Sequence, residues 1–207
     1  MSDWHEQELP ELQAVKQWPA GFSWIAYPDE QARRASHGIH TETGVWLVDP
    51  VDAKGLDDQV TEWGDVSGVV VLHDRHTRDA VKITRRHDIA VSVPKWMKKT
   101  IEKIDAPTEP IEETLPETDY GVRQLINTAD WEEAFLVHER TKTVIVPESV
   151  GTLPSFRVGD NELGVHPSLE EPPRKLIEWN PDRILVGHGQ SIHRNGTKRL
   201  QEAFDVF

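Results

Sequence analysis

Acidic and imidazole side chains follow four short apolar runs of this chain, each at the point where a buried strand would end. The four pairs are Asp49 after 45–48, the segment 73–79 (His-Asp-Arg-His-Thr-Arg-Asp) after 69–72, Glu148 after 143–146, and His188 within Gly-His-Gly after 183–186. Imidazoles and carboxylates are the protein groups that bind divalent cations and transfer protons. If these groups meet in space, the chemistry that they predict is metal-assisted hydrolysis or the binding of a charged small molecule.

The elements that must position these groups follow from the spacing of apolar residues. The four runs, together with 89–93, are rich in β-branched residues and nearly continuous in apolarity, which is typical of strands covered on both faces. Helical spacing lies between and after them, at 56–63, 97–104, 176–179 and 200–207. Strands that alternate with helices predict an α/β sheet, and ligands of such sheets bind at the carboxyl ends of the strands.

One domain over residues 1–207 is the expected organisation for a chain of this length. Residues 105–119 contain three prolines, six acidic residues and no basic residue. We expect this segment to be an exposed connection inside the domain. An amphipathic helix or a linker between two lobes is the alternative.

The order and spacing of the motifs resemble those of the metallo-β-lactamase superfamily over residues 40–204. Proteins of that superfamily carry an acid after an early strand, H-x-H-x-D-H after the next, a later Asp that bridges two metals, and a last His often set in G-H-G. The corresponding segments here are GVWLVDP, VVVLHDRHTRDA, TVIVPESVG and LVGHGQSIH. The resemblance implies a four-layer αβ/βα sandwich of two mixed sheets flanked by helices, with a metal-dependent hydrolase site at the strand ends.

The metal-site motif departs from that pattern and is closest to a divergent branch that reads D-R-H-x-R-D. Alignment on the strand places Asp74 at the first motif His, His76 at the second, Arg78 at the motif Asp, Asp79 at the last His of the motif, and Glu148 at the bridging acid. The resemblance thus implies four metal ligands and two catalytic groups: Asp74, His76, Glu148 and His188 for the metal, and Asp79 and Arg78 for catalysis. An alternative register uses His73 with His76, which would need a turn between them.

Another imidazole of the family pattern has no counterpart in this alignment. The segment 127–134 (NTADWEEA) stands where a P-G-H element would supply it, and only Asp130 or Glu132 could substitute there. Arg78 also places a permanent cation where the motif acid would hold a metal. This favours a metal-free site over a single ion, and a single ion over two. A ligand set rich in oxygen suits manganese, iron or magnesium, whereas imidazole ligands favour zinc.

The residues and the resemblance support two different functions. The first is a metal-dependent hydrolase with an altered site, and the second is a non-catalytic protein that binds an anionic small molecule or a protein partner in the same cleft. The cations that would hold an anion are Arg75, Arg78, Lys82 and Arg157. Arg75 and Arg157 are therefore the predicted substrate-binding residues. The Gly- and Pro-rich segment 151–167 is a candidate lid, and Phe156 within it is a candidate ligand contact.

Composition narrows the partners and the compartment. The net charge of −13 opposes binding to a phosphate backbone, so nucleic acid processing, a third possibility, is disfavoured. The absence of cysteine excludes disulfides and thiolate metal sites. We expect no membrane partner and a cytoplasmic location, because the N-terminal segment is polar and acidic and no run of about 18 apolar residues occurs. The oligomeric state and the substrate are not determined by the sequence.

Overall fold

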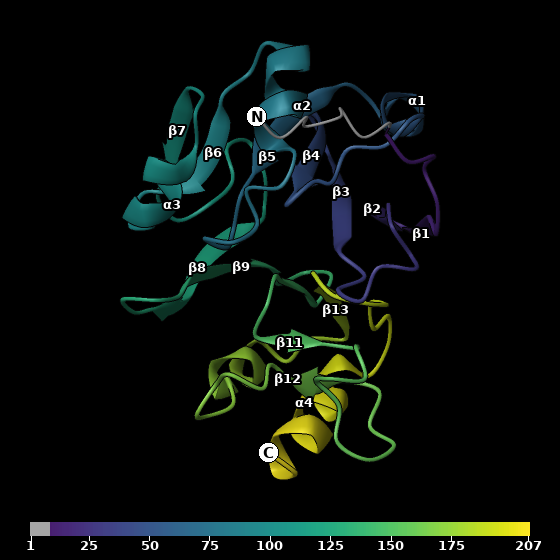
Figure 1. Ribbon diagram of the computed structural model, residues 1–207, viewed down its shortest axis with the longest axis vertical. Helices are drawn as coiled ribbons and strands as arrows, with labels where there is room; N and C mark the ends of the chain where they lie inside the picture. The colour runs from purple at the N-terminus through teal and green to yellow at the C-terminus, as the bar shows by residue number, and fades with distance from the viewer. Residues whose placement is uncertain (1–8) are drawn as a thin grey trace, which may run out of the picture.

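Two β-sheets face each other in the computed structural model, which describes residues 9–207 (Figure 1). The expectation about the polar N-terminal segment concerns residues 1–8 in part, and these residues lie outside the described ones. The strands of the first sheet follow the order of the chain. They are β1 (Lys16–Trp18), β2 (Gly21–Ile25), β3 (Ala35–Thr41), β4 (Gly44–Val48), β5 (Val66–Val70), β6 (Val91–Pro94) and β7 (Thr108–Ile111). Pairing is antiparallel from β1 to β4 and parallel from β4 to β7.

The second sheet has the order β13-β10-β9-β8 and is also mixed. Its strands are β8 (Gly121–Asn127), β9 (Glu132–His138), β10 (Thr143–Val146) and β13 (Arg183–Val186). Only the pair of β10 with β13 is parallel. A short third sheet pairs β11 (Val150–Gly151) with β12 (Gly164–Val165).

Helices flank the two large sheets and complete a four-layer α/β sandwich. The helices on the side of the first sheet are α1 (Leu56–Thr61), α2 (Ala80–His87) and α3 (Lys98–Lys103). On the side of the second sheet lie the 3-10 helix η1 (Arg174–Trp179) and α4 (Gly196–Asp205), at the lower end of Figure 1. The order of layers that the sequence implied is therefore confirmed.

Strands β9, β10 and β13 divide their side chains between two apolar cores. Leu136, Ile145 and Leu185 join the larger core between the two sheets. Their neighbours Phe135, Val137, Val144, Val146, Ile184 and Val186 join the second core, under α4 and η1. Successive side chains of a strand point to opposite faces, so the central residues of each of these strands need to be apolar on both faces. This explains why the runs 143–146 and 183–186 are nearly continuous in apolarity.

Most elements inferred from the sequence are present, with two differences. The expected exposed connection 105–119 is wrong at 108–111, because these residues form β7 and pair in parallel with β6. The helical spacing at 176–179 belongs to a 3-10 helix, not to an α-helix. Among the described residues, no helix is long and apolar enough to cross a membrane.

His37 of β3 is buried between the sheets and gives stability that depends on pH. Its side chain is 2% exposed, accepts a hydrogen bond from the Ser23 hydroxyl at 2.7 Å, and donates one to the Val186 carbonyl at 3.2 Å. Burial, followed by the positive charge of Arg78, lowers the pKa of His37 from 6.5 to about 3. The folded state thus disfavours the protonated form. Its contribution to the free energy of unfolding is complete above pH 6.5 and is lost as the pH falls from 6.5 toward 3.

Replacing His37 with Gln should therefore flatten the loss of stability in acid. Gln can keep both hydrogen bonds but takes up no proton, so the slope between pH 6 and 4 should fall by up to about 1.4 kcal/mol per pH unit. Urea unfolding at a series of pH values measures this slope of the free energy of unfolding. The same change at His40, exposed on the same strand, is the control. An unchanged slope in the His37→Gln protein would contradict this assignment.

Candidate metal centre

Three side chains from three strand ends meet at one point. Glu148 Oε2 lies 2.8 Å from His76 Nε2 and 2.9 Å from His188 Nε2, and the two Nε2 atoms are 3.2 Å apart. All three residues are at most 8% exposed. They come from the segment that follows β5 in the first sheet and from the segments that follow the parallel neighbours β10 and β13 in the second sheet, all at carboxyl ends of strands. The sequence prediction that these three groups converge agrees with this arrangement.

The Gly-His-Gly sequence is required by the backbone around His188. A Cβ atom on Gly187 would lie 2.1 Å from the carbonyl oxygen of Pro147, so only glycine lets the chain after β13 approach the chain after β10. Gly189 has a φ of +88°, in the left-handed region that favours glycine. The two glycines thus bring His188 against Glu148 and turn the chain away afterwards.

A tight turn separates His73 from His76. The His76 N–H donates to the His73 carbonyl at 2.9 Å, and the two ring centroids are 4.9 Å apart. This is the turn that the alternative register needed. His73, His76 and Glu148 each offer one possible ligand atom within 4.8 Å of the other two. The turn therefore brings His73, and not the carboxylate of Asp74, to the centre.

The Nδ1 atoms of His76 and His188 form hydrogen bonds with oxygen acceptors. His76 Nδ1 lies 3.2 Å from Asp49 Oδ2, and His188 Nδ1 lies 2.7 Å from the Ala32 carbonyl oxygen. Carboxylate and carbonyl oxygens accept hydrogen bonds, so both Nδ1 atoms carry hydrogen. The Nε2 atoms of the neutral rings then present lone pairs to Glu148 Oε2. Histidines that bind metals are oriented in this way, with the second nitrogen donating to a carboxylate or a carbonyl group.

His73 differs from the other two imidazoles in its tautomer. Its Nδ1 accepts the Arg75 backbone N–H at 3.0 Å, so Nε2 carries the hydrogen in the neutral ring. Burial, followed by repulsion from His76, lowers the pKa of His73 to about 3, and the ring is neutral. Among the described residues, buried Nε2 has no hydrogen-bond partner. His73 would have to give up its bond to Arg75 before it could act as a further ligand.

A fourth imidazole, from His166, holds the other oxygen of Glu148. His166 Nδ1 accepts the Ser168 backbone N–H at 3.1 Å, and Nε2 lies 3.2 Å from Glu148 Oε1. Burial by itself would raise the pKa of Glu148, but the imidazoles around it, first among them His166 through its hydrogen bond, hold this pKa far below its usual range. Glu148 is therefore an ionised carboxylate with one oxygen held by His166 and the other turned to the centre.

The guanidinium of Arg78 borders the centre and binds backbone carbonyl groups. Nη1 donates to the Ala35 and Asp49 carbonyls at 2.6 and 2.8 Å, and Nη2 donates to Gly187 at 3.2 Å. Nη2 also lies 3.5 Å from His76 Nε2. Burial, only partly offset by Asp49, lowers the pKa of Arg78 from 12.5 to about 10, so it is a cation at neutral pH. Arg78 thus ties β3, the end of β4 and the end of β13 together beside the three ligand atoms.

The other predicted site residues lie away from these atoms. The Asp74 carboxylate faces Lys103 of α3 at 3.1 Å, and Asp79 Oδ2 accepts the Asp52 backbone N–H at 2.9 Å. Arg75 is exposed, with its guanidinium 4.7 Å from the centroid of the Trp131 ring. Arg157 is exposed as well. Of the four predicted metal ligands, the structure thus brings together His76, Glu148 and His188.

The two residues considered as replacements for the missing imidazole have other contacts. Glu132 accepts hydrogen bonds from the backbone and the hydroxyl of Thr100 at 3.0 and 2.9 Å, at the start of α3, and Asp130 is exposed. Glu133, which sequence reasoning missed, is fully buried. Its carboxylate accepts the backbone N–H groups of Glu148 and Ser149, both at 2.9 Å. Glu133 thereby fixes the backbone that carries Glu148.

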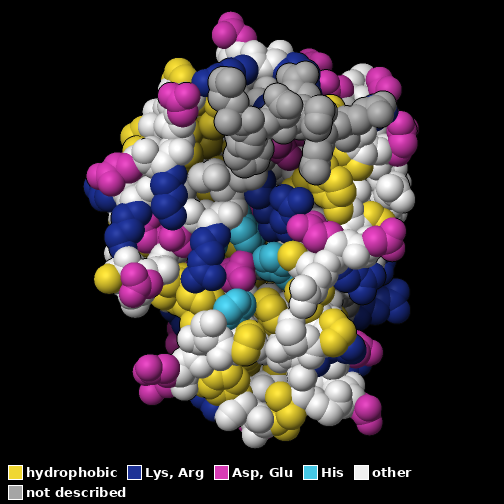
Figure 2. All heavy atoms as spheres, in the orientation of Figure 1, with side chains coloured by type: hydrophobic (Ala, Val, Ile, Leu, Met, Phe, Trp, Pro, Cys, Tyr) yellow, Lys and Arg dark blue, Asp and Glu magenta, His cyan; other side chains and the backbone are white. Residues whose placement is uncertain are grey.

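Aromatic rings form one wall of the centre. His166 packs edge-on between Trp131 and Phe156, with centroid distances of 4.9 and 5.0 Å. Phe156 is buried, and the centroid of its ring also lies 6.1 Å from that of His188. Figure 2 shows His side chains gathered in a hollow at the middle of one face, with Lys and Arg side chains above and beside them. Basic side chains therefore lie near the histidines of this face together with a few acidic ones, although the chain is acidic as a whole.

The donor set fits a single divalent cation. His76 Nε2, His188 Nε2 and Glu148 Oε2 turn lone pairs toward one another at 2.8–3.2 Å, and such contacts need a proton or a cation among them. Both imidazoles already use their N–H groups elsewhere, so a proton there would create an imidazolium. First-row metals bind imidazole nitrogen and carboxylate oxygen at about 2.0–2.2 Å, which places neighbouring ligand atoms about 3 Å apart. The spacing agrees with that requirement.

Comparison with known proteins identifies the fold. No family model and no curated protein matches the sequence. Among solved structures, the DIM-1 metallo-β-lactamase matches with a TM-score of 0.68 at 16% identity, covering 96% of this chain and 99% of that chain. TMB-1 matches with 0.66 at 13%, over 96% and 99%. The metallo-β-lactamase from Pontibacter korlensis matches with 0.65 at 12%, over 94% and 99%. Identities this low establish the architecture alone, and the chain has the metallo-β-lactamase fold.

Proposed function

We propose that this chain is a metal-dependent hydrolase with one divalent cation, held by His76, His188 and Glu148. The observation that carries the proposal is the convergence of three lone-pair atoms whose imidazoles have their N–H groups bound to oxygen. Manganese, iron and zinc are the candidate ions, because two nitrogen ligands and one oxygen ligand suit all three. Arg78 beside the site leaves room for one ion and not for two.

The side chains around the ligands would hold them in place for the reaction. The cation, when bound, would polarise the bond to be hydrolysed and lower the pKa of water. Asp49 and the Ala32 carbonyl orient the two imidazoles, and His166 keeps Glu148 from turning both oxygens inward. The Arg78 guanidinium would stabilise negative charge that develops beside His76. The aromatic wall of Trp131 and Phe156 would exclude water from one side.

A small anionic substrate is the class that we propose for this centre. Arg75 is exposed and stands on the Trp131 ring, which packs against His73 and His166, and there it can pair with a carboxylate or a phosphate group. Arg157 lies on the segment that carries Phe156 and can approach the same substrate from the other side. We place the reaction in the cytoplasm, which the lack of cysteine supports.

Metal binding tests the proposal directly. Protein purified without added metal is analysed for manganese, iron and zinc, and the melting temperature is followed as each ion is added. We expect close to one equivalent, with stabilisation that rises with ion concentration because the ion binds only the folded state. Glu148→Gln should lose both effects. Glu170→Gln, an exposed position on the segment between β12 and η1, is the matched control and should keep them.

The alternative, a metal-free binder of anions, is supported by the Arg78 cation beside the ligand atoms. It predicts less than about a tenth of an equivalent of metal and no change in melting temperature with any of the three ions. It also predicts stabilisation by phosphate or citrate that persists in excess chelator. That combination of results would exclude the hydrolase. Release of 4-nitrophenol from 4-nitrophenyl phosphate or 4-nitrophenyl acetate, with metal and without, then tests the reaction itself.

A further inference from the structure

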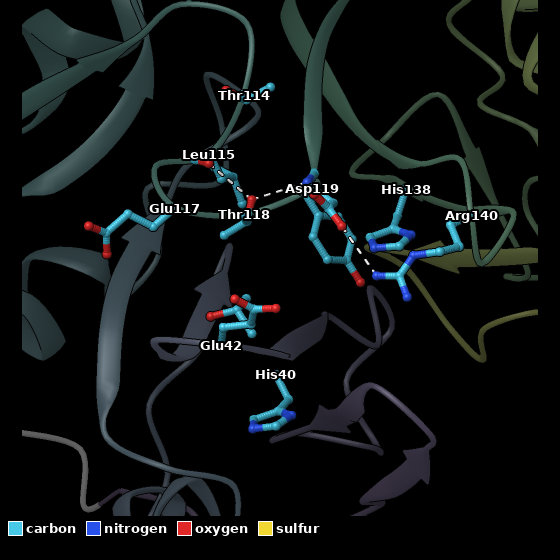
Figure 3. Close-up of a pocket in the computed structure, with 11 residues that line it drawn as sticks. His40, Glu42, Thr114, Leu115, Glu117, Thr118, Asp119, His138 and Arg140 are labelled. Carbon is cyan, nitrogen blue, oxygen red and sulfur yellow. Dashed lines mark hydrogen bonds and ion pairs between the residues drawn. The ribbon is translucent and has the colours of Figure 1, made fainter.

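A second cavity lies at the other end of the sandwich. It has a volume of about 530 Å³ and is lined by the β3–β4 turn, the loop 114–120 and the β9–β10 turn (Figure 3). The metal centre follows the carboxyl ends of β4 and β10, whereas this cavity lies beside the turns that precede these two strands. The two sites are thus at opposite edges of the sheets, and the cavity takes no part in the chemistry proposed above. Its volume is within the range of small-molecule sites.

Two largely buried side chains, His138 and Tyr120, present hydrogen-bond donors on one side of this cavity. His138, 7% exposed, accepts the Thr141 N–H at Nδ1, so its Nε2 carries the hydrogen. Burial lowers the pKa of His138, which keeps the ring neutral. Tyr120 is 4% exposed, and burial raises the pKa of its hydroxyl to about 12, so this group also stays a donor. Among residues 9–207, neither His138 Nε2 nor the Tyr120 hydroxyl forms a hydrogen bond with the protein, and both residues line the cavity. The two donors are therefore free to bind an acceptor that enters it.

The opposite side of the cavity is acidic. Glu42, at the β3–β4 turn, and Glu117, in the loop 114–120, are exposed, and within the described part of the chain neither forms an ion pair. Figure 3 shows Glu42 across the cavity from His138 and Arg140. Arg140 is an exposed cation on the donor side, paired with Asp119 at 3.2 Å. Two neutral donors and the Arg140–Asp119 ion pair therefore line one wall, and two carboxylates without an ion pair among the described residues line the other.

We propose that this cavity binds a small zwitterion, a free amino acid or a close analogue. The ligand carboxylate would accept hydrogen bonds from the Tyr120 hydroxyl and His138 Nε2, with Arg140 at the rim. The ligand ammonium group would pair with Glu42, with Glu117 close by. A simple anion would leave the acids unpaired and would be repelled by them, and a simple cation would offer no acceptor to the Tyr120 and His138 donors. A ligand with both charges satisfies both walls.

Calorimetric titration of the whole protein tests this proposal with named probes. The zwitterions are L-alanine, L-glutamine and γ-aminobutyrate, and the half-ligands are propionate and propylamine. We expect at least one zwitterion to bind, and both half-ligands to bind at least about tenfold more weakly. Tyr120→Phe, which removes one oxygen atom, and Glu42→Gln, which removes one charge, should each raise the Kd of that zwitterion by about tenfold or more.

Controls separate a local effect from a loss of folding. Glu139→Gln changes an exposed acid in the β9–β10 turn that does not line the cavity, and it should leave the Kd unchanged. Glu42 is exposed, so its variant should keep the melting temperature of the parent even if Tyr120→Phe lowers it. No heat of binding for any zwitterion up to about 10 mM overturns the proposal. Equal binding of propylamine, or an unchanged Kd in Glu42→Gln, overturns it as well.

Discussion

Replacing Arg78 with Met should make the metal-free protein less stable by about 2–4 kcal/mol and make divalent ions bind at least tenfold more tightly. The stability loss follows from the hydrogen bonds to the Ala35, Asp49 and Gly187 carbonyls, which no other side chain can replace at once. The gain in affinity follows from removing a cation whose Nη2 lies 3.5 Å from His76 Nε2. Urea unfolding and competition with a fluorescent chelator measure the two effects.

Arg78→Lys is the matched control, because it keeps the charge and loses the geometry. A single ammonium group cannot reach three carbonyl oxygens in different directions, so stability should fall nearly as far as in the Met variant. Ion affinity should stay close to that of the parent protein, because the repulsion remains. Equal ion affinity in the Met variant and the parent would show that the guanidinium does not oppose the cation.

Replacing Glu133 with Leu should lower the free energy of unfolding by about 3–5 kcal/mol. The carboxylate is fully buried and accepts four hydrogen bonds: from the backbone of Glu148, from the backbone and the hydroxyl of Ser149, and from Trp131 Nε1. Leu has a similar volume but leaves all four donors buried without acceptors. Chemical denaturation measures the loss, and ion titration shows whether the displaced backbone carries Glu148 away from the imidazoles.

Glu133→Gln should recover about half of that stability. Its amide oxygen can accept the two backbone N–H groups and its amide nitrogen can donate to the Ser149 hydroxyl, whereas the Trp131 N–H then meets another donor. If ion binding is intact in both variants, Glu133 supports only the fold and does not position Glu148. If Leu is tolerated without loss of stability, the buried hydrogen bonds have no net value.

The strand ends were predictable from the sequence because apolar runs mark buried strands by themselves. The runs that became β4, β10 and β13 place Asp49, Glu148 and His188 without any knowledge of distant contacts. Parallel strands align their carboxyl ends, so the meeting of His188 with Glu148 follows from topology. The spacing of His73 and His76 was also informative, since it required the turn that the structure contains.

The missing parts of the prediction depend on contacts between segments far apart in the chain. His166 reaches Glu148 from a Gly- and Pro-rich segment with no periodic pattern. Its T-shaped packing between Trp131 and Phe156 and its backbone bond to Ser149 determine its position. The apolar pattern did not predict β9, because this strand carries two acids and a histidine that are buried by tertiary contacts. The sequence does contain a signal for Glu133. Two adjacent acids directly before the apolar run AFLV indicate a buried strand whose first residues are carboxylates, and buried carboxylates need hydrogen-bond partners.

The distance along the chain between the ligands has a consequence for biosynthesis. His76 and His188 are 112 residues apart, and the Ala32 carbonyl that orients His188 is 156 residues from it. Ribosomes deliver the N-terminal half first, so His76 and Asp49 emerge long before β13 exists to complete the triangle. Under the proposed function, the three-ligand site could take up a cation only when translation is almost finished, and truncated chains that end before β13 would lack the site even if the first sheet had formed.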